Sequence, residues 1–291
     1  MRNTFINNLV KRARLDDSII LIVGDLGFNV VEPFQSEFPD RFINAGICEQ
    51  NMASMSAGVA SEGYKVFVYS IANFPTFRCA EQIRNDICYH NLDVTIVTVG
   101  GGLAYGNLGY SHHAIQDYGL MRLFPEMTIL SPGDPNEVHF CMNFAFGSTS
   151  PKYLRLRKAG EENLNKNKSI QSPGKWNNIT KKGKRKIILT TGYGLKLAFD
   201  LIYKNKKYND FDVYSCPIWG SKFTHLQESQ INDFNEIITV EDHLLSGGFG
   251  SWIKESVLDK KLISKISCIS INLSVIGKVG TENNLLNYLS E

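Results

Sequence analysis

The chain has 291 residues, of which 43% are hydrophobic and 21% are charged, ordinary values for a soluble globular protein with two cores. Its formal net charge of +2 is too small to favour nucleic acid or an anionic membrane as a partner. No apolar run approaches the roughly 20 residues of a membrane span, and six cysteines without CxxC spacing argue against a zinc site or a disulfide framework, so we expect a cytoplasmic protein.

Short apolar runs alternate with amphipathic segments in the first half of the chain. This alternation predicts a parallel sheet with helices on both faces. The predicted helix at 134–146 has a good N-cap residue in Asp134, followed by Pro135 at the first helical position. The predicted strands are 18–23, 64–69, 93–99 and 127–130, and the other predicted helices are 49–61 and 77–89.

The pattern breaks at residues 160–186, which are rich in Asn, Lys, Ser and Gly and are typical of a linker or an exposed hairpin. The basic run at 181–186 indicates a solvated loop. A second alternating series follows, with strands at 186–190, 211–214, 235–241 and 266–271 and helices at 195–202, after Gly247 and at the C-terminus. We place a domain boundary near residue 172, which gives domains 1–172 and 173–291.

Residues 41–52, RFINAGICEQNM, run from a strand directly into a helix with Glu49 in its first turn. On spacing alone, Glu49 is a helix-start carboxylate that gains from the helix dipole. The segment also resembles the F-x-N-x-G-I-x-E-Q-N-M signature of the transketolase family. The resemblance implies that Glu49 hydrogen-bonds the aminopyrimidine of thiamine diphosphate and favours the imino tautomer, which deprotonates the thiazolium carbon. Glu49 is therefore our candidate catalytic and cofactor-binding residue.

Two further segments resemble the same family around the cofactor. Residues 70–86, SIANFPTFRCAEQIRND, are similar to its F-x-x-x-R-x-x-E-Q-I-R-N-D stretch. The resemblance implies that Phe74 packs on the aminopyrimidine ring and that Phe77 helps to line the pocket, whereas core packing is the plain alternative for both. Asp25, in VGDLG, matches a family position near the cofactor across the subunit interface, but it is equally good as a turn former.

The segment 100–117, GGGLAYGNLGYSHHAIQD, predicts a glycine-rich loop at the carboxyl edge of the sheet, where open α/β folds bind ligands. It resembles the family's G-x-x-G-x-T-H-x-x-x-E-D loop. The resemblance implies that His112 contacts hydroxyl and carbonyl oxygens of the sugar, with His113 as a second substrate-binding candidate. Leu108 stands where full-length transketolases have an acidic residue, and Ser111 replaces Thr, so the stereospecificity for the sugar stays open.

Residues 152–160, KYLRLRKAG, resemble the family's P-x-x-L-R-x-x-R-G stretch. Lys158 stands at the position of the arginine that binds a sugar phosphate, and Arg157 precedes it. A lysine acts there as a point charge, where arginine would grip phosphate with two parallel bonds. Both residues are candidate substrate-binding groups.

The glycines of TVEDHLLSGGFGSW (239–252) resemble a further family segment, and we interpret them as allowing close helix–strand packing. His243 in this segment could approach the active site. The pair Gly192 and Gly194 lacks the third glycine of a dinucleotide site and indicates a strand–helix turn.

The resemblance covers nearly all of this chain but only the back half of a full transketolase. The G-D-G motif and downstream Asn that bind diphosphate and a divalent metal are missing, and we predict no metal site in this chain. We therefore expect a split enzyme in which an N-terminal transketolase subunit holds Mg²⁺ and the cofactor diphosphate, in a two-plus-two heterotetramer. Met52, Met55 and Phe74 are expected at its apolar interface.

The leading function is transfer of a two-carbon ketol unit between sugars or sugar phosphates. Three alternatives stay open at this point. The first is an acyloin condensation like that of deoxyxylulose-phosphate synthase. The second is the beta subunit of a 2-oxoacid dehydrogenase, which usually lacks the EQNM and SHH forms seen here. The third is a non-catalytic half-transketolase that only binds a partner, against which Glu49 and His112 argue.

Overall fold

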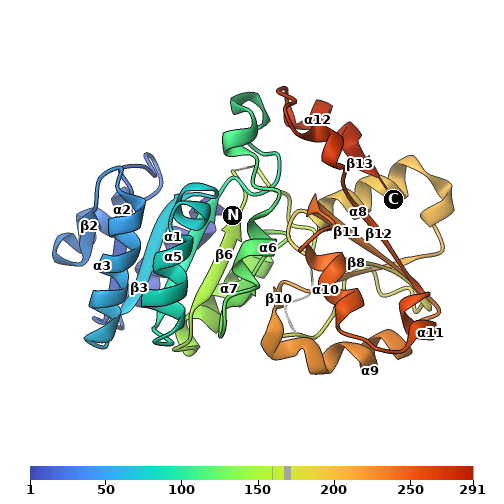
Figure 1. Ribbon diagram of the computed structural model, residues 1–291, viewed down its shortest axis with the longest axis horizontal. Helices are drawn as coiled ribbons and strands as arrows, with labels where there is room; N and C mark the ends of the chain where they lie inside the picture. The colour runs from blue at the N-terminus through green and yellow to red at the C-terminus, as the bar shows by residue number, and fades with distance from the viewer. Residues whose placement is uncertain (159, 167–171, 291) are drawn as a thin grey trace.

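A computed structural model describes residues 1–158, 160–166 and 172–290. It contains two mostly parallel sheets that stand side by side, each with helices on both faces (Figure 1). The strand order is β10-β5-β6-β4-β3-β1-β2 in the first sheet and β13-β12-β11-β8-β9-β7 in the second. The predicted α/β class is therefore confirmed.

The strands of the first sheet are apolar on both faces, so helices can pack on either side of it. In β1, Ile20 and Ile22 join one hydrophobic cluster, while Ile19, Leu21 and Val23 join the other, because successive side chains of a strand alternate between faces. Its strands are β1 (Ile19–Val23), β2 (Phe42–Asn44), β3 (Lys65–Ile71), β4 (Val94–Val99), β5 (Thr128–Leu130), β6 (Lys152–Leu156) and the antiparallel β10 (Ile218–Trp219). One face is covered by α1 (Arg2–Ala13), α2 (Glu32–Glu37) and α7 (Pro135–Gly147), and the other by α3 (Glu49–Ser61), a π-helical turn (Ile83–Cys88) and α6 (Asp117–Met121).

Two predicted helices are confirmed and one differs. Helix α3 begins at Glu49, and the Asp134 carboxylate caps α7 by accepting from the Glu137 amide over 2.8 Å. The predicted helix at 77–89 is instead broken into α4 (Phe74–Phe77), α5 (Ala80–Gln82) and the π-helical turn. Pro75 lies in the first turn of α4, where a missing N–H costs nothing, so the helical region begins before Phe77.

The second sheet is flanked by one long helix on one face and several short ones on the other. Its strands are β7 (Asn177–Asn178), β8 (Lys186–Thr190), β9 (Asp212–Ser215), β11 (Glu236–Leu244), β12 (Ile266–Ile271) and β13 (Leu289–Ser290). Helix α8 (Gly194–Lys204) covers one face, and α9 (Gln227–Asn232), α10 (Phe249–Glu255) and α11 (Lys260–Ile263) cover the other. A Cβ on Gly250 would lie only 2.5 Å from Thr239 Oγ1, so this glycine does allow close packing of α10 on β11, as predicted.

The segment between the two series is only partly as predicted. The basic run at 181–186 is exposed. Trp176, however, is buried, stacks on Phe234 at 5.9 Å between ring centroids and donates its indole N–H to Gln227 over 2.8 Å. The prediction of an exposed hairpin is therefore wrong there, because a buried aromatic anchors the backbone. Residues 167–171 lie outside the described residues, and the boundary near residue 172 stays a prediction.

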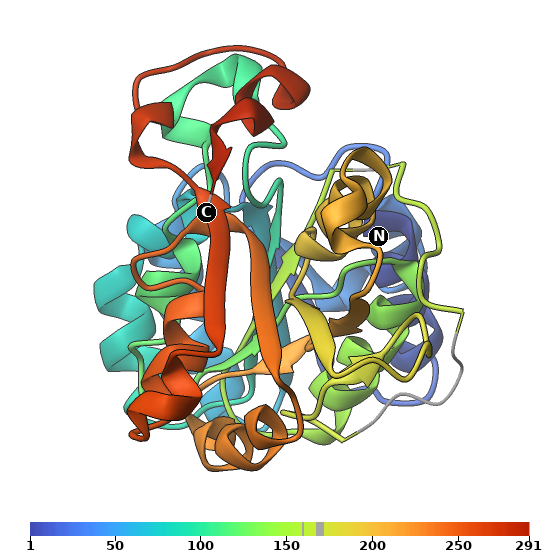
Figure 2. The ribbon, with the colours of Figure 1, turned by 90° about the vertical axis from the view of Figure 1, so that its right-hand side faces the viewer.

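Two segments far apart in the sequence lie side by side beyond the carboxyl ends of the strands (Figures 1 and 2). The first follows β4 and contains the 3₁₀ turns η3 (Gly106–Leu108) and η4 (Tyr110–His112). The second follows β12 and contains η7 (Leu273–Val275), α12 (Glu282–Leu285) and η8 (Leu286–Tyr288). The Gly280 amide donates to the Gly106 carbonyl over 3.3 Å, so the two segments are in direct contact.

Five of the six cysteines are buried and Cys48 is exposed. Within the described part of the chain, no helix has the length and apolar character needed to cross a membrane.

Candidate active site

Most of the candidate site residues follow the carboxyl ends of neighbouring parallel strands. Glu49 follows β2, Phe74 follows β3, and His112 follows β4. In the sheet these strands stand in the order β4-β3-β1-β2, so all three segments leave the same edge. This is the edge at which open α/β sheets bind ligands.

Glu49 lies at the first turn of α3, and only 2% of its surface is exposed. Its carboxylate Oε2 accepts a hydrogen bond from Arg78 Nη1 over 2.8 Å. The Arg78 guanidinium also lies over the Phe74 ring, 4.8 Å from the centroid. A buried charge needs such a partner, because burial without one is costly. Arg78 therefore links the carboxylate of Glu49 to the Phe74 ring.

A cavity of about 480 Å³ opens beside Phe74 and Phe77. Phe74 is half-buried and meets the His112 ring edge-on, at 5.3 Å between centroids, while Phe77 is exposed. The other lining residues are polar or amphipathic: Asn73, Arg78, Tyr110, Ser111, His113 and Gln116. Aromatic rings on one side and convergent polar groups on the other suit a planar, hydrogen-bonding ligand. Glu49 does not line the cavity, but Arg78, which binds its carboxyl, does, and such a lining is compatible with an aminopyrimidine.

The two adjacent histidines lie in different environments. His112 is partly exposed, its Nδ1 lies 3.0 Å from Ser111 Oγ, and burial together with the nearby His113 lowers its pKa. It is therefore neutral at pH 7 and can accept or donate a hydrogen bond. His113 is 1% exposed, and its Nε2 lies 3.2 Å from the Gly106 carbonyl, which holds the ring inside the loop.

Asn73 is a site residue that the sequence analysis did not single out. Its side-chain amide donates to the backbone carbonyls of Ser111 and His113, each over 3.0 Å. It thereby ties the loop after β4 to the end of β3. The sequence feature that could have indicated Asn73 as a site residue is its position, as a polar residue soon after the buried strand β3.

Arg157 and Lys158 point to different neighbours. Arg157 Nη2 lies 2.5 Å from Glu282 Oε2, and its guanidinium covers the Tyr193 ring at 3.2 Å, so this side chain contacts the second domain. Lys158 is exposed, and its Nζ lies 5.4 Å from the centroid of the Tyr105 ring in the loop that carries His112. The structure thus leaves Lys158 accessible beside the loop and gives Arg157 other partners.

Asp25 sits in a turn at the end of β1, with a left-handed φ of 55°. Its Oδ1 accepts from Asn44 Nδ2 over 2.9 Å, and its backbone amide donates to Asn44 Oδ1 over 3.1 Å. This reciprocal pair joins the ends of β1 and β2, just before the turn into α3. The turn-forming interpretation is observed, and a role toward the cofactor stays a prediction.

The interface expectation needs one correction. Met52 is fully buried in the core, because it lies one helical turn after Glu49 on the inward face of α3. Met55 and Phe74 are partly exposed. The large apolar side chains that are exposed near the site are Phe28, Ile47, Phe77, Leu108 and Tyr110.

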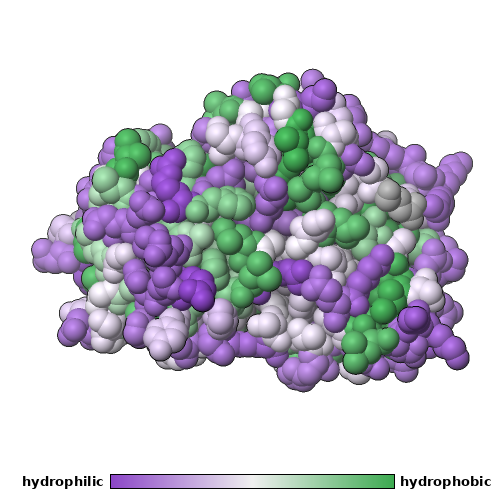
Figure 3. Space-filling model, in the orientation of Figure 1, coloured by the Kyte–Doolittle hydropathy of each residue, from purple (hydrophilic) through white to green (hydrophobic). Residues whose placement is uncertain are grey.

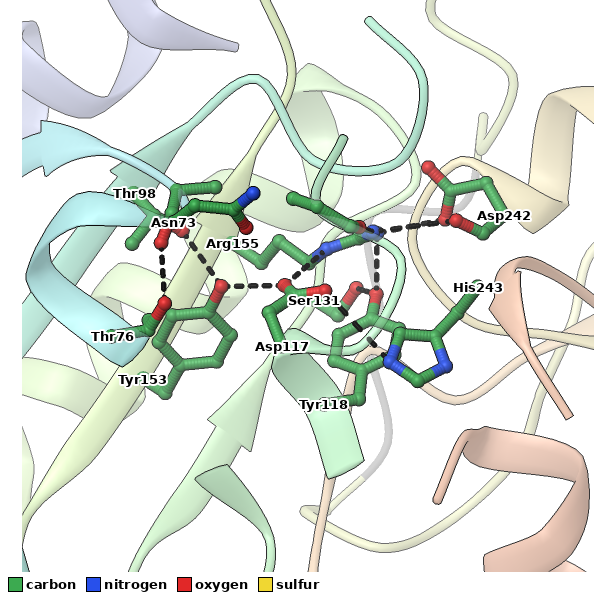
Figure 4. Close-up of polar contacts among 12 residues, drawn as sticks. Asn73, Thr76, Thr98, Asp117, Tyr118, Ser131, Tyr153, Arg155, Asp242 and His243 are labelled. Carbon is green, nitrogen blue, oxygen red and sulfur yellow. Dashed lines mark hydrogen bonds and ion pairs between the residues drawn. The ribbon is translucent and has the colours of Figure 1, made fainter. Parts of the chain in front are cut away.

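A buried polar network links the two domains next to the site (Figure 4). Arg155 on β6 donates to Asp117 Oδ2 and to Asp242 Oδ1, each over 2.7 Å. His243 stacks on Tyr118 at 5.0 Å, and its Nε2 lies 3.8 Å from Asp117 Oδ1. His243 is therefore part of this network and does not line the cavity beside Phe74.

Within the described ranges, no group of three or more His, Cys, Asp or Glu side chains could hold a metal ion.

Comparison with known proteins identifies the family of this architecture. Residues 1–160 match the family model described as transketolase, pyrimidine binding domain. The chain is 31% identical to the putative transketolase C-terminal section of Methanocaldococcus jannaschii, over 99% of this chain and 91% of that protein. It is 30% identical to a subunit of the apulose-4-phosphate transketolase of Phocaeicola vulgatus, over 91% of this chain and 86% of that protein.

A longer relative and a solved structure complete the comparison. Identity to 1-deoxy-D-xylulose-5-phosphate synthase of Clostridium perfringens is 30%, over 93% of this chain but only 44% of that protein. A structure described as a split gene transketolase, inactive beta4 tetramer, is 26% identical with a TM-score of 0.82, over 98% of this chain and 92% of the other.

Proposed function

Because the chain belongs to the transketolase family and carries its pyrimidine-binding domain, we propose that it is the C-terminal subunit of a split, thiamine diphosphate-dependent transketolase. Its reaction is the transfer of a two-carbon ketol unit between sugars or sugar phosphates. The observation that supports this most directly is the buried carboxyl of Glu49, fixed by Arg78 beside the half-exposed ring of Phe74.

The cofactor supplies the nucleophilic carbon that carries the ketol unit. In this proposal the Glu49 carboxyl shares a proton with the pyrimidine ring, Phe74 packs against that ring, and Phe77 closes the outer wall of its pocket. Asp25, in its turn at the end of β1, contributes to the cofactor site from the subunit interface.

In this proposal the substrate is held by His112, His113 and Lys158, of which His113 lines the cavity and His112 adjoins Phe74. His112, neutral at pH 7, donates to or accepts from the hydroxyl and carbonyl oxygens of the sugar, and His113 supports it from inside the loop. Lys158 provides a positive charge for a phosphorylated substrate. Arg157 is a weaker candidate for direct contact because Glu282 already occupies its Nη2.

A partner subunit completes the site in this proposal. It is an N-terminal transketolase subunit that binds Mg²⁺ and the cofactor diphosphate, in a two-plus-two heterotetramer. The chain matches most of the length of a transketolase C-terminal section and of a transketolase subunit, which supports a partner. It also matches less than half of the longer deoxyxylulose-phosphate synthase, so the remaining half of such an enzyme would come from another chain. Exposed apolar side chains near the site, Leu108 and Tyr110 among them, support it as well. Figure 3 shows hydrophobic surface mixed with polar surface at the top of the molecule, where Figure 1 places the segments after β4 and β12.

An acyloin condensation like that of deoxyxylulose-phosphate synthase is the second candidate, favoured by the 30% identity to that enzyme over nearly the whole chain. The two reactions differ in their donor. A ketose phosphate, with apulose 4-phosphate among those tested, is the donor we expect. Release of CO₂ from pyruvate by the assembled enzyme would favour the second candidate instead.

Calorimetric titration of thiamine diphosphate and Mg²⁺ tests the proposal, with the chain alone and with the chain mixed with its N-terminal partner. We expect tight binding in the mixture only, followed by ketol transfer. Glu49→Gln is the matched variant: its amide keeps the shape of the side chain but cannot share a proton, so it should assemble normally and lose activity. Tight binding by the chain alone would contradict the partner requirement, and an active Glu49→Gln assembly would contradict the role of Glu49.

A further inference from the structure

We propose that residues 272–290, here called the cap, hold the loop of residues 100–115, here called the His112 loop, in its working conformation. The second domain would thereby act as a positioning element for the reaction. This inference rests on the proposed role of His112. The cap carries none of the candidate catalytic groups, so its contribution would pass entirely through the loop.

The cap and the loop share a small hydrophobic core of their own. Six side chains form it, none more than 4% exposed: Leu103, Ile115, Leu244, Ile271, Val275 and Leu285. Leu103 and Ile115 come from the two ends of the His112 loop, while Val275 and Leu285 come from the cap. Both views show the two segments side by side, raised above the sheets (Figures 1 and 2). The loop is therefore fixed at both ends by contacts with the second domain.

Gly106 is the point of closest approach. A Cβ on this residue would lie 2.6 Å from the Gly280 carbonyl oxygen and 2.7 Å from Leu285 Cδ1. The Gly106 carbonyl accepts from the Gly280 amide over 3.3 Å and lies 3.2 Å from His113 Nε2. The Gly106 carbonyl oxygen thus contacts both the cap and the ring of His113, the residue next to His112. A shift of the cap would act directly on His113 and, through the backbone, on the neighbouring His112.

Backbone hydrogen bonds hold the base of the loop, from Gly100 and Gly101 to the Leu156 carbonyl and between Gly102 and Ala114, so contacts with the cap act mainly on its outer part. Gly100, Gly102 and Gly109 all have positive φ, and glycine-rich backbone loses much conformational entropy when it is ordered. On the side of the first sheet, Asn73 binds the carbonyls of Ser111 and His113. The loop is therefore held by the first domain through Asn73 and by the second domain through the cap.

An ion pair ties the cap to the first sheet. Arg157, at the end of β6, binds Glu282 in α12 and lies within 4.0 Å of Asp242 in β11. Its guanidinium also covers Tyr193. These contacts join the cap to the end of β6 and to β11.

The substitution Gly106→Ala tests the clamp. Gly106 does not have positive φ, so alanine is compatible with its backbone and only the contact with the cap opposes it. Gly147→Ala is the matched control, because Gly147 also lacks positive φ and a Cβ there would meet nothing within 4 Å. Leu285→Ala removes the cap side chain that faces Gly106. It tests the same contact if Gly106→Ala fails to fold.

Two measurements are needed. Hydrogen exchange of peptide 103–115 reports the order of the loop without requiring activity, and we expect it to rise about tenfold in Gly106→Ala and Leu285→Ala and to stay unchanged in Gly147→Ala. In the assembled enzyme, the kcat/KM for the sugar should fall about 10- to 100-fold, because a misplaced loop no longer aligns His112. The affinity for thiamine diphosphate should fall less than kcat/KM, since Glu49 and Phe74 are not in the loop, although Tyr110, Ser111 and His113 of the loop line the same cavity.

Unchanged exchange in both loop variants would overturn the inference, and so would a loosened loop with wild-type kinetics. A wild-type assembly that transfers no ketol unit would instead overturn the proposed function, and the positioning role with it.

Discussion

Arg155 is buried where the two domains meet, and its removal is the most severe single perturbation that we expect for this chain. Its side chain donates five hydrogen bonds, to Asp117, Asp242, Tyr118 and the carbonyls of Ala114 and Asp242. Arg155→Met keeps much of the side-chain volume but leaves two carboxylates, each no more than 1% exposed, without their shared cation.

Breaking a buried ion pair by removing one partner costs about 3–5 kcal/mol. Two carboxylates lose their partner here, so we expect the upper end of that range. Domains are stable by only about 5–15 kcal/mol, so Arg155→Met should bring the chain close to unfolding. Arg155 also binds the Ala114 carbonyl over 2.8 Å, so the same change should loosen the end of the His112 loop.

Urea unfolding at fixed protein concentration measures the effect. Arg14→Met is the control, because the Arg14–Glu37 pair has a similar distance of 2.6 Å but lies on the surface, where screening makes such pairs nearly neutral. We expect no measurable change in the control. A free energy of unfolding for Arg155→Met within about 1 kcal/mol of wild type would refute the argument, since it would mean that the two carboxylates find other partners or take up protons at no cost.

Three other outcomes are expected. Lys158→Met should raise the KM for a phosphorylated substrate about tenfold and leave that of an unphosphorylated sugar unchanged, which steady-state kinetics can check. Because burial lowers the pKa of His112 from its ordinary value near 6.5, activity should fall only on acidification below that value, and His112→Asn should leave a weak residual rate without this acidic limb. Burial raises the pKa of Glu241 to about 8, so the folded state keeps a proton that the unfolded chain releases near pH 4.5. Stability should therefore decline as the pH rises from about 4.5 to 8, and Glu241→Gln should flatten this decline in denaturation curves.

The elements that could be predicted from sequence are those whose patterns are local. The strand at 186–190 is a short apolar run, and helix α3 begins at Glu49 with Met52, Ser56 and Ala60 spaced along its buried face. The same spacing could have shown that Met52 belongs to the core. The buried Trp176 was missed because its neighbours are polar, and its partners Phe234 and Gln227 come from distant parts of the chain.

The candidate site likewise contains residues that local sequence patterns predict and residues that only the packing of distant segments brings together. Glu49, Phe74 and His112 each lie in a short motif after a strand, so their common edge follows from the order of the strands. The network around Arg155 could not be predicted, because Asp117 and Asp242 are brought to it by the packing of two separate sheets. No spacing along the chain encodes that meeting.

The basic residues after β6 show how geometry separates neighbours that a motif treats alike. Side chains two apart on a strand point the same way, so Arg155 and Arg157 both face the second domain, where Asp242 lies near both of them. Lys158, one residue further, turns to Tyr105 and stays exposed. Arg157 and Glu282 then hold the cap, and the cap meets the His112 loop at Gly106. The end of one short strand thus carries both the charge that we propose for a phosphorylated substrate and the contact with the cap that we propose positions the His112 loop.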